Sequence, residues 1–195
     1  GTGCGPWRLS TTRGSRSGPG CWTSSLGWAA CRLRPRPDLH PHQERLTRQN
    51  AERLFRAYDV VIDGSDNYST RYAVNDACVR LDIPWVYGSV ERFSGQLSFF
   101  PGAGGPCYRC LFAEPPEPGS TASCDEIGVL GVLPGIIGTM QAAEALKWIV
   151  GAGETLIGRL AMLDLRTMQM RTVSYDRNSS CAVCGAAGEP RQAPA

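Results

Sequence analysis

The chain has 195 residues, of which 42% are hydrophobic, so it is long enough to bury one core and to form a single domain. It contains no apolar run that would cross a bilayer and no signal pattern, and nine cysteines without such a signal indicate a reducing, cytoplasmic setting. The net charge of +2 combines +5 in residues 1–45 with −3 in residues 46–195, and the arginines of the first part follow no helical face, which disfavours a nucleic-acid partner.

Residues 1–45 are rich in glycine and proline and show no periodicity of 3.6 or 2 residues, which is typical of irregular chain. Gly1 and Gly3 resemble the start of a phosphate-binding glycine loop, but Pro6 and Trp7 stand where its last glycine and its helix belong. We therefore predict an irregular first segment, and on composition we predict a disordered tail over residues 186–195.

Order is predicted to begin near Leu46. Residues 47–55 favour a short helix, with Thr47 as the candidate N-cap. The next four segments predict a βαβ unit. They are a run of β-branched residues, a turn, an apolar stripe at helical spacing and a second strand that follows a proline. These four segments are residues 58–63, 64–67, 68–81 and 85–87.

Three further strands and one long helix are predicted in the second part of the chain. The strands are residues 93–100 and a hairpin formed by 159–165 and 170–175. The helix is Ile136–Val150, ended by Gly151, and we expect its apolar stripe to face the core. That stripe consists of Ile136, Met140, Ala143, Leu146 and Ile149.

The Asp66-Asn67 pair comes directly after the first predicted strand. Ligands of open α/β sheets bind beyond the carboxyl ends of the strands, so this turn stands where chemistry is usually located. Asp66 is either a contact for Mg²⁺ or substrate, or the N-cap of the helix over residues 68–81. The residue pattern alone leaves both interpretations open.

Two CxxC pairs, Cys107 with Cys110 and Cys181 with Cys184, are separated by 70 residues. Four thiols in this arrangement fit one tetrahedral structural Zn²⁺, which would fasten the end of the chain to its middle. The gap is longer than in compact zinc ribbons, so redox pairs or free thiols remain the alternatives. The proline-rich residues 114–123 between the pairs predict an exposed crossover.

A more specific pattern runs through the chain from about Leu46 to Gly185. It consists of Val60–Asn67, Thr70–Tyr72, Asn75–Cys78, Gly95–Gln96, Gly105–Cys110, Gly128–Gly131, Pro134–Gly138, Gln141–Glu144 and Cys181–Gly185. Together these segments resemble the MoeB/ThiF family, the adenylyltransferases that activate ubiquitin-like sulfur carriers and share ancestry with ubiquitin-activating enzymes. The resemblance implies an α/β, Rossmann-like three-layer sheet with a structural zinc site.

Such enzymes join ATP to the C-terminal glycine carboxylate of a sulfur carrier protein, and sulfur transfer for molybdopterin, thiamine or cysteine biosynthesis follows. The resemblance implies that Asp66 is the carboxylate linked to Mg²⁺ and ATP, that Asn67 contacts the nucleotide, and that the four paired cysteines bind zinc. It also implies a homodimer. Cys124 matches a cysteine that attacks the adenylate or carries a persulfide. Asp125 and Glu126 beside it would raise its pKa and slow it, so an inert surface thiol remains the alternative.

The family's glycine-rich phosphate loop, ribose-binding acid and phosphate-binding lysine are not recognisable before Leu46, and the only lysine of the sequence is Lys147. We therefore interpret residues 1–45 as a segment foreign to the family. Residues 46–185 are interpreted as the C-terminal half of the adenylyltransferase domain, without its N-terminal nucleotide-binding βαβ unit. On this basis we expect an impaired adenylyltransferase, with a catalytically inactive, zinc-stabilised carrier-binding remnant as the alternative.

Overall fold

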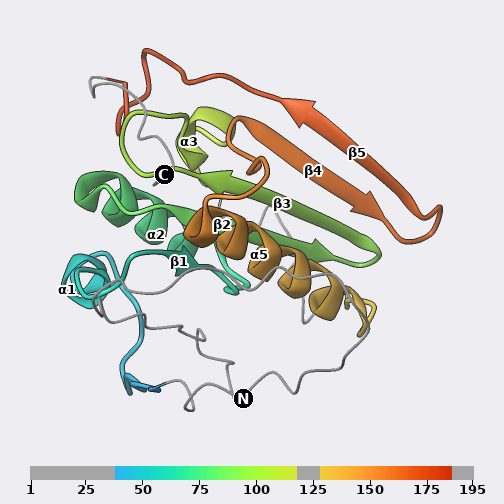
Figure 1. Cartoon of the computed structure of the whole chain (residues 1–195), viewed down its shortest axis with the longest axis horizontal. Helices are drawn as coiled ribbons and strands as arrows, with labels where there is room; N and C mark the ends of the chain where they lie inside the picture. Colours follow the sequence, from blue (N-terminus) through green and yellow to red (C-terminus); the bar gives the residue numbers. More distant parts are fainter. Residues whose placement is uncertain (1–37, 118–127, 186–195) are drawn as a thin grey trace, which may run out of the picture.

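Figure 1 presents the computed structural model, which describes residues 38–117 and 128–185. Five strands form one mixed sheet in the order β1-β2-β3-β4-β5. The strands are β1 (Val61–Ile62), β2 (Trp85–Glu91), β3 (Ser94–Phe100), β4 (Arg159–Asp164) and β5 (Gln169–Ser174). The helices named below are α1 (Ala51–Phe55), α2 (Tyr68–Leu81), α3 (Tyr108–Leu111) and α5 (Leu133–Val150).

The predicted βαβ unit is confirmed. β1 and β2 pair in parallel and α2 connects them, with the bounds that its apolar stripe predicts. β1 is shorter than predicted, because only Val61 and Ile62 pair with β2. The N–H of Asp63 still donates to the carbonyl oxygen of Val86 at 3.0 Å, so the chain leaves the sheet directly after this bond.

The other strand pairs are antiparallel, and the predicted β4–β5 hairpin is confirmed. β2 continues to Glu91 and turns directly into β3, so it is longer than the predicted strand over residues 85–87. β5 forms one edge of the sheet in the described part of the chain, and all of its residues are exposed.

The helices cover opposite faces of the sheet, which gives three layers (Figure 1). Successive residues of a strand point to opposite faces, so Trp85 packs with α1 and α2 whereas Val86 packs with α5. Trp85 stacks on Phe100 with ring centroids 4.9 Å apart on the first face, and Phe99 contacts Trp148 of α5 on the second. Each of these aromatic pairs belongs to one of the two larger clusters of the core.

The prediction that the apolar stripe of α5 faces the core is wrong. Ile136, Leu146 and Ile149 are 36%, 56% and 41% exposed. Apolar residues occur around most of this helix, so their spacing does not identify the buried face. That face is Leu133, Ile137, Gln141, Glu144, Ala145 and Trp148. The helix also begins three residues earlier than predicted, and Gly151 ends it in the left-handed conformation as predicted.

The first predicted helix is also corrected at its start. α1 begins at Ala51, and Asn50 rather than Thr47 occupies the N-cap position. The Thr47 N–H donates to Asn50 Oδ1 at 2.7 Å, so residues 47–50 form a turn ahead of the helix. The described residues 38–45 contain neither helix nor strand, while residues 1–37, Cys124 and residues 186–195 lie outside the described part of the chain.

None of the helices in residues 38–117 and 128–185 combines the length and the apolar content that crossing a membrane requires.

Candidate functional site

The fold brings together the four cysteines of the two CxxC pairs. Cys107 and Cys110 lie at α3, and Cys181 and Cys184 follow β5. The Sγ atoms are 3.7 Å apart for Cys107 and Cys181, 3.3 Å for Cys110 and Cys184 and 4.0 Å for Cys107 and Cys110. All four lie within 4.8 Å of one another. A disulfide needs about 2.05 Å, so these thiols are free, and the group can hold a metal ion.

The donor set of this cysteine centre fits zinc. Tetrahedral Zn²⁺ with Zn–S bonds of about 2.3 Å separates its sulfurs by about 3.8 Å. The backbone N–H groups of Cys107 and Asn178 both donate to Cys110 Sγ at 3.4 Å. Burial acts to raise the pKa of Cys181, but hydrogen bonds from the Cys184 and Val183 backbone amides outweigh it and lower this pKa to about 7. These hydrogen bonds favour the thiolate form of Cys181, which is the form that binds a metal ion. Burial raises the pKa values of Cys107 and Cys184, so metal binding to these two thiols must displace their protons.

A buried ion pair connects the cysteine centre to α2. Arg109 donates from Nε to Asp76 Oδ1 at 2.8 Å and from Nη2 to Asp76 Oδ2 at 2.9 Å, and its guanidinium lies 4.6 Å from the Tyr72 ring centroid. The Tyr108 N–H donates to Asn75 Oδ1 at 2.8 Å. Burial acts to raise the pKa of Asp76, but the hydrogen bonds from Arg109 outweigh it and hold the pKa below its usual value.

The second candidate site is the turn between β1 and α2, and here the structure decides which residue caps the helix. Asn67 Oδ1 accepts from the Thr70 N–H at 2.9 Å and from the Ser69 hydroxyl at 2.8 Å. The interpretation of Asp66 as the N-cap is therefore wrong, because Asn67 holds that position. Asp66 is exposed, and within the described residues its carboxylate accepts a hydrogen bond from Asn67 Nδ2 at 3.3 Å.

Buried polar groups surround this turn. Asp63 Oδ1 accepts from the Ser65 N–H at 2.8 Å, and Arg71 Nη2 donates to the Ser65 carbonyl oxygen at 3.2 Å. The Arg71 guanidinium lies 5.4 Å from the Tyr68 ring centroid and 5.6 Å from that of Tyr87. In the described part of the chain Asp63 Oδ2, Ser65 Oγ and Arg71 Nε are buried without a hydrogen-bond partner. Burial raises the pKa of Asp63.

α2 spans the distance between the two candidate sites. Asn67 caps its start, and Val79 near its end packs against Cys107 and Cys184. Fourteen residues of helix are about 21 Å long, so the structure does not bring Asp66 and the cysteine centre together. Cys124 lies outside the described residues.

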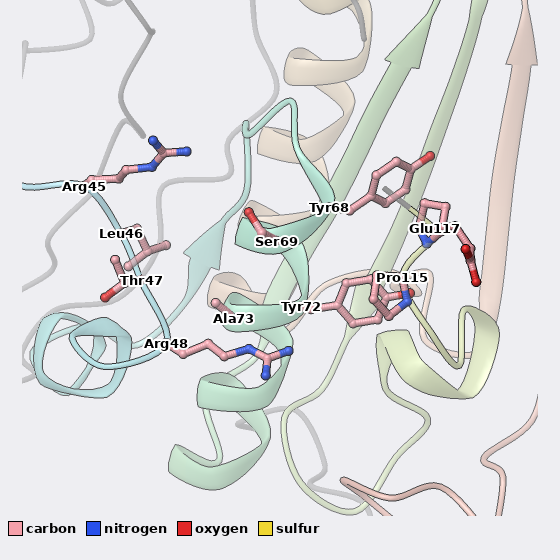
Figure 2. A pocket seen from close by; sticks show the side chains of 11 residues that line it. Arg45, Leu46, Thr47, Arg48, Tyr68, Ser69, Tyr72, Ala73, Pro115 and Glu117 are labelled. Carbon is pink, nitrogen blue, oxygen red and sulfur yellow. The ribbon is translucent and has the colours of Figure 1, made fainter. Parts of the chain in front are cut away.

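A cleft of about 720 Å³ lies beside the first turns of α2 (Figure 2). In Figure 2, Tyr68 and Tyr72 point from α2 toward Pro115 and Glu117. The lining residues are Arg45, Leu46, Thr47, Arg48, Tyr68, Ser69, Tyr72, Ala73, Pro115, Pro116 and Glu117. Arg45 and Arg48 bring positive charge to this cleft, and Glu117 brings negative charge.

Sequence reasoning did not select Asp63, Asp76, Arg109 or Gln141 as important residues. Each of them lies inside one of the segments that carry the family resemblance, so the resemblance could have identified them as candidates. Their roles depend on contacts across 33 to 78 residues of sequence, which no local pattern reveals.

Comparison with known proteins agrees with the resemblance found in the sequence. The ThiF family model matches residues 25–183, and so begins ahead of Leu46. The chain is 46% identical over 165 residues to the sulfur carrier protein adenylyltransferase of Thermus thermophilus, covering 82% of this chain and 60% of that protein. It is 44% identical over 159 residues to the adenylyltransferase and sulfurtransferase MOCS3 of Drosophila yakuba, covering 81% of this chain and 35% of that protein.

Among solved structures, Escherichia coli MccB crystallised with MccA-N7isoASN matches with a TM-score of 0.60 and 17% identity, over 72% of this chain and 44% of MccB. This likeness supports the fold. The chain therefore spans less than two thirds of the length of each of these proteins.

Proposed function

Because this chain belongs to the ThiF family, we propose that it takes part in the ATP-dependent adenylylation of the C-terminal glycine of a ubiquitin-like sulfur carrier protein. In this reaction a carboxylate oxygen of the glycine attacks the α-phosphorus of ATP, an acyl-adenylate forms and pyrophosphate leaves. The names of the Thermus and Drosophila relatives, adenylyltransferase in both cases, support this class of reaction.

The observation that carries the proposal is the exposed Asp66 carboxylate at the carboxyl end of β1. Asn67 caps α2 in its place, so Asp66 is not needed for the helix. Mg²⁺ bound there would offset the negative charge that builds up on the phosphates during the attack. We assign Asp66 the role of holding Mg²⁺ against ATP, and Asn67 the role of fixing the turn from which Asp66 projects and of contacting the nucleotide.

We assign the cysteine centre a structural role, with Zn²⁺ as its metal. Four protein thiolates close the coordination sphere, so such a metal contributes folding energy and leaves no position for substrate. Four free thiolate ligands also require a reducing setting, and we therefore propose a cytoplasmic location. Cys124 is proposed to receive the activated acyl group: its thiolate attacks the adenylate carbonyl carbon, a thioester forms and AMP leaves.

A second copy of the chain is proposed to cover the outer side of α5. Exposed apolar side chains lie near both ends of that helix, and exposed apolar surface of this kind is typical of a protein interface. The residues are Val132, Ile136, Leu146, Ile149 and Val150.

We propose that turnover by this chain is slow. Lys147 is the only lysine of the sequence, and its Nζ contacts the Glu154 carbonyl oxygen at 2.6 Å and Glu144 Oε1 at 2.5 Å. It is therefore engaged at the end of α5 and is not free to neutralise a phosphate. The same observation favours the alternative function, a catalytically inactive zinc-stabilised module that binds the carrier.

Carrier-dependent ATP–pyrophosphate exchange distinguishes the two functions. The first function predicts exchange that is slower than that of the Thermus relative assayed alongside and that is lost in Asp66→Asn. Carrier binding without any exchange, in a folded sample loaded with zinc, supports the inactive module and overturns the first function.

A further inference from the structure

Gln141 lies buried in the middle of α5, where its side chain meets the end of β1 and the first half of β2. Its Nε2 donates to the carbonyl oxygen of Asp63 at 2.7 Å and to that of Val86 at 3.2 Å. Val86 belongs to β2 and also accepts the Asp63 N–H. One side-chain amide thus joins the two strands at the point where their backbone pairing stops.

The end of β1 needs this donor. β1 pairs with β2 only through Ile62, and beyond it the chain turns away from the sheet. The Asp63 carbonyl is therefore left without a strand partner, and an unpaired buried carbonyl is costly. Gln141 supplies the missing donor from the α5 face of the sheet.

β2 is shaped to admit this side chain. A Cβ atom at Gly88 would lie 2.5 Å from Gln141 Cδ, which is closer than two carbon atoms approach without bonding. A glycine at this position therefore makes the space that the Gln141 amide occupies. The fit also offers an independent way to displace Gln141, because any side chain at Gly88 must push it aside.

The turn itself is held by hydrogen bonds and not by packing at its glycine. A Cβ atom at Gly64 would meet no atom within 4 Å. On one side of Gly64 the carbonyl of Asp63 is bound by Gln141, and on the other side the carbonyl of Ser65 is bound by Arg71. These two side chains come from helices on opposite faces of the sheet.

We propose that Gln141 is a positioning residue for Asp66. By fixing the carbonyl of Asp63, it sets the point and direction in which the chain leaves β1, and hence where the Asp66 carboxylate points. Gln141 acts through the backbone and touches no substrate. The inference deepens the proposed function, on which it rests for the role of Asp66 as a metal-binding carboxylate.

The test compares Gln141→Met with Glu144→Met. Glu144 lies one turn further along the same buried face, and its Oε2 accepts the Leu156 N–H at 2.8 Å, away from the turn. The first readout is amide hydrogen exchange of residues 63–67. Gln141→Met loses the two hydrogen bonds of the Gln141 amide and is expected to speed this exchange about tenfold. Glu144→Met is expected to leave it unchanged. Gly88→Ala should reproduce the effect, and unchanged exchange in Gln141→Met overturns the inference.

The second readout is Mn²⁺ affinity, measured from paramagnetic broadening of the amide signals of residues 64–67. Gln141→Met is expected to weaken Mn²⁺ binding at least about fivefold, while Glu144→Met leaves it unchanged. Faster exchange with unaltered Mn²⁺ affinity would overturn the positioning role. If the wild-type chain and Asp66→Asn bind Mn²⁺ equally, the metal role in the proposed function fails, whereas hydrogen exchange still decides whether Gln141 fixes the turn.

Discussion

Arg109 and Asp76 form a two-point ion pair, with Nε to Oδ1 at 2.8 Å and Nη2 to Oδ2 at 2.9 Å, that connects the cysteine centre to α2. Their side chains are only 15% and 11% exposed. Two N–H groups of the planar guanidinium donate to the two oxygens of one carboxylate, an arrangement that fixes orientation as well as distance. This ion pair therefore connects the cysteine centre to the helix that Asn67 caps.

Replacing Arg109 by methionine should destabilise the fold by about 3 kcal/mol, because it leaves the Asp76 carboxylate largely buried without its partner. Urea unfolding followed by far-UV circular dichroism measures this loss. The control is Arg166→Met, which breaks an exposed pair with Asp164 at 3.0 Å and should change stability little. Similar effects of the two changes would contradict this role of the ion pair.

Asp63 should make stability depend on pH in the opposite sense to a carboxylate held by a salt bridge. Burial raises its pKa in the folded state above the unfolded value of 3.8. Its contribution is therefore fully present below that unfolded value and is lost as the pH rises through the folded pKa. Asp63→Asn removes this loss and keeps an oxygen to accept the Ser65 N–H. Urea midpoints at several pH values should shift in favour of the variant as the pH rises.

A constant difference between Asp63→Asn and the wild-type chain across the same pH range would contradict this account of Asp63.

Removing one sulfur from the cysteine centre should release its metal. Cys184→Ser is expected to lower bound zinc well below one per chain and to reduce stability by more than about 3 kcal/mol, because metal binding contributes directly to folding. The control is Cys78→Ala, a buried thiol of α2 outside the cluster, which should keep its zinc and lose about 1 kcal/mol. Elemental analysis together with urea unfolding checks both, and full zinc content in Cys184→Ser would argue against a four-sulfur site.

The proposed dimer should depend on the outer side of α5. Leu146 is 56% exposed and is one of the apolar residues of this side, so Leu146→Glu places a charge in the proposed interface. Light scattering coupled to size-exclusion chromatography should find a dimer for the wild-type chain and a monomer for the variant. The matched control is Met168→Glu, at another exposed apolar residue, in the β4–β5 hairpin. A monomeric wild-type chain, or loss of the dimer in both variants, would exclude this face.

Local patterns predicted both bounds of α2 correctly, because its apolar stripe, the turn before it and the proline after it all agree, although Asp66 was the wrong choice of N-cap. They failed for α5, where apolar residues surround the helix and the buried face contains Gln141 and Glu144. Those two polar residues are buried because they bind backbone groups far away in the sequence, at Asp63 and Leu156. The distance between such partners is the physical reason that sequence reasoning did not identify them.

The sequence also predicted only part of the candidate site. The spacing of the cysteines anticipated a cluster whose assembly the fold confirms, since two CxxC pairs have few ways to satisfy four thiols together. The pattern around Asp66 left its role open, because Asp and Asn are both good N-caps. Only the hydrogen bond from the Thr70 N–H to Asn67 Oδ1 decides between them.

The most direct test of the proposed adenylyltransferase function is calorimetric binding of Mg·ATP to the zinc-loaded chain and to Asp66→Asn, with zinc content and circular dichroism measured on the same samples. The account predicts that the wild-type chain binds Mg·ATP and that Asp66→Asn binds it at least about tenfold more weakly, because the carboxylate that holds the metal is gone. Equal binding by the two chains, or no binding by a folded wild-type chain with full zinc content, would contradict it.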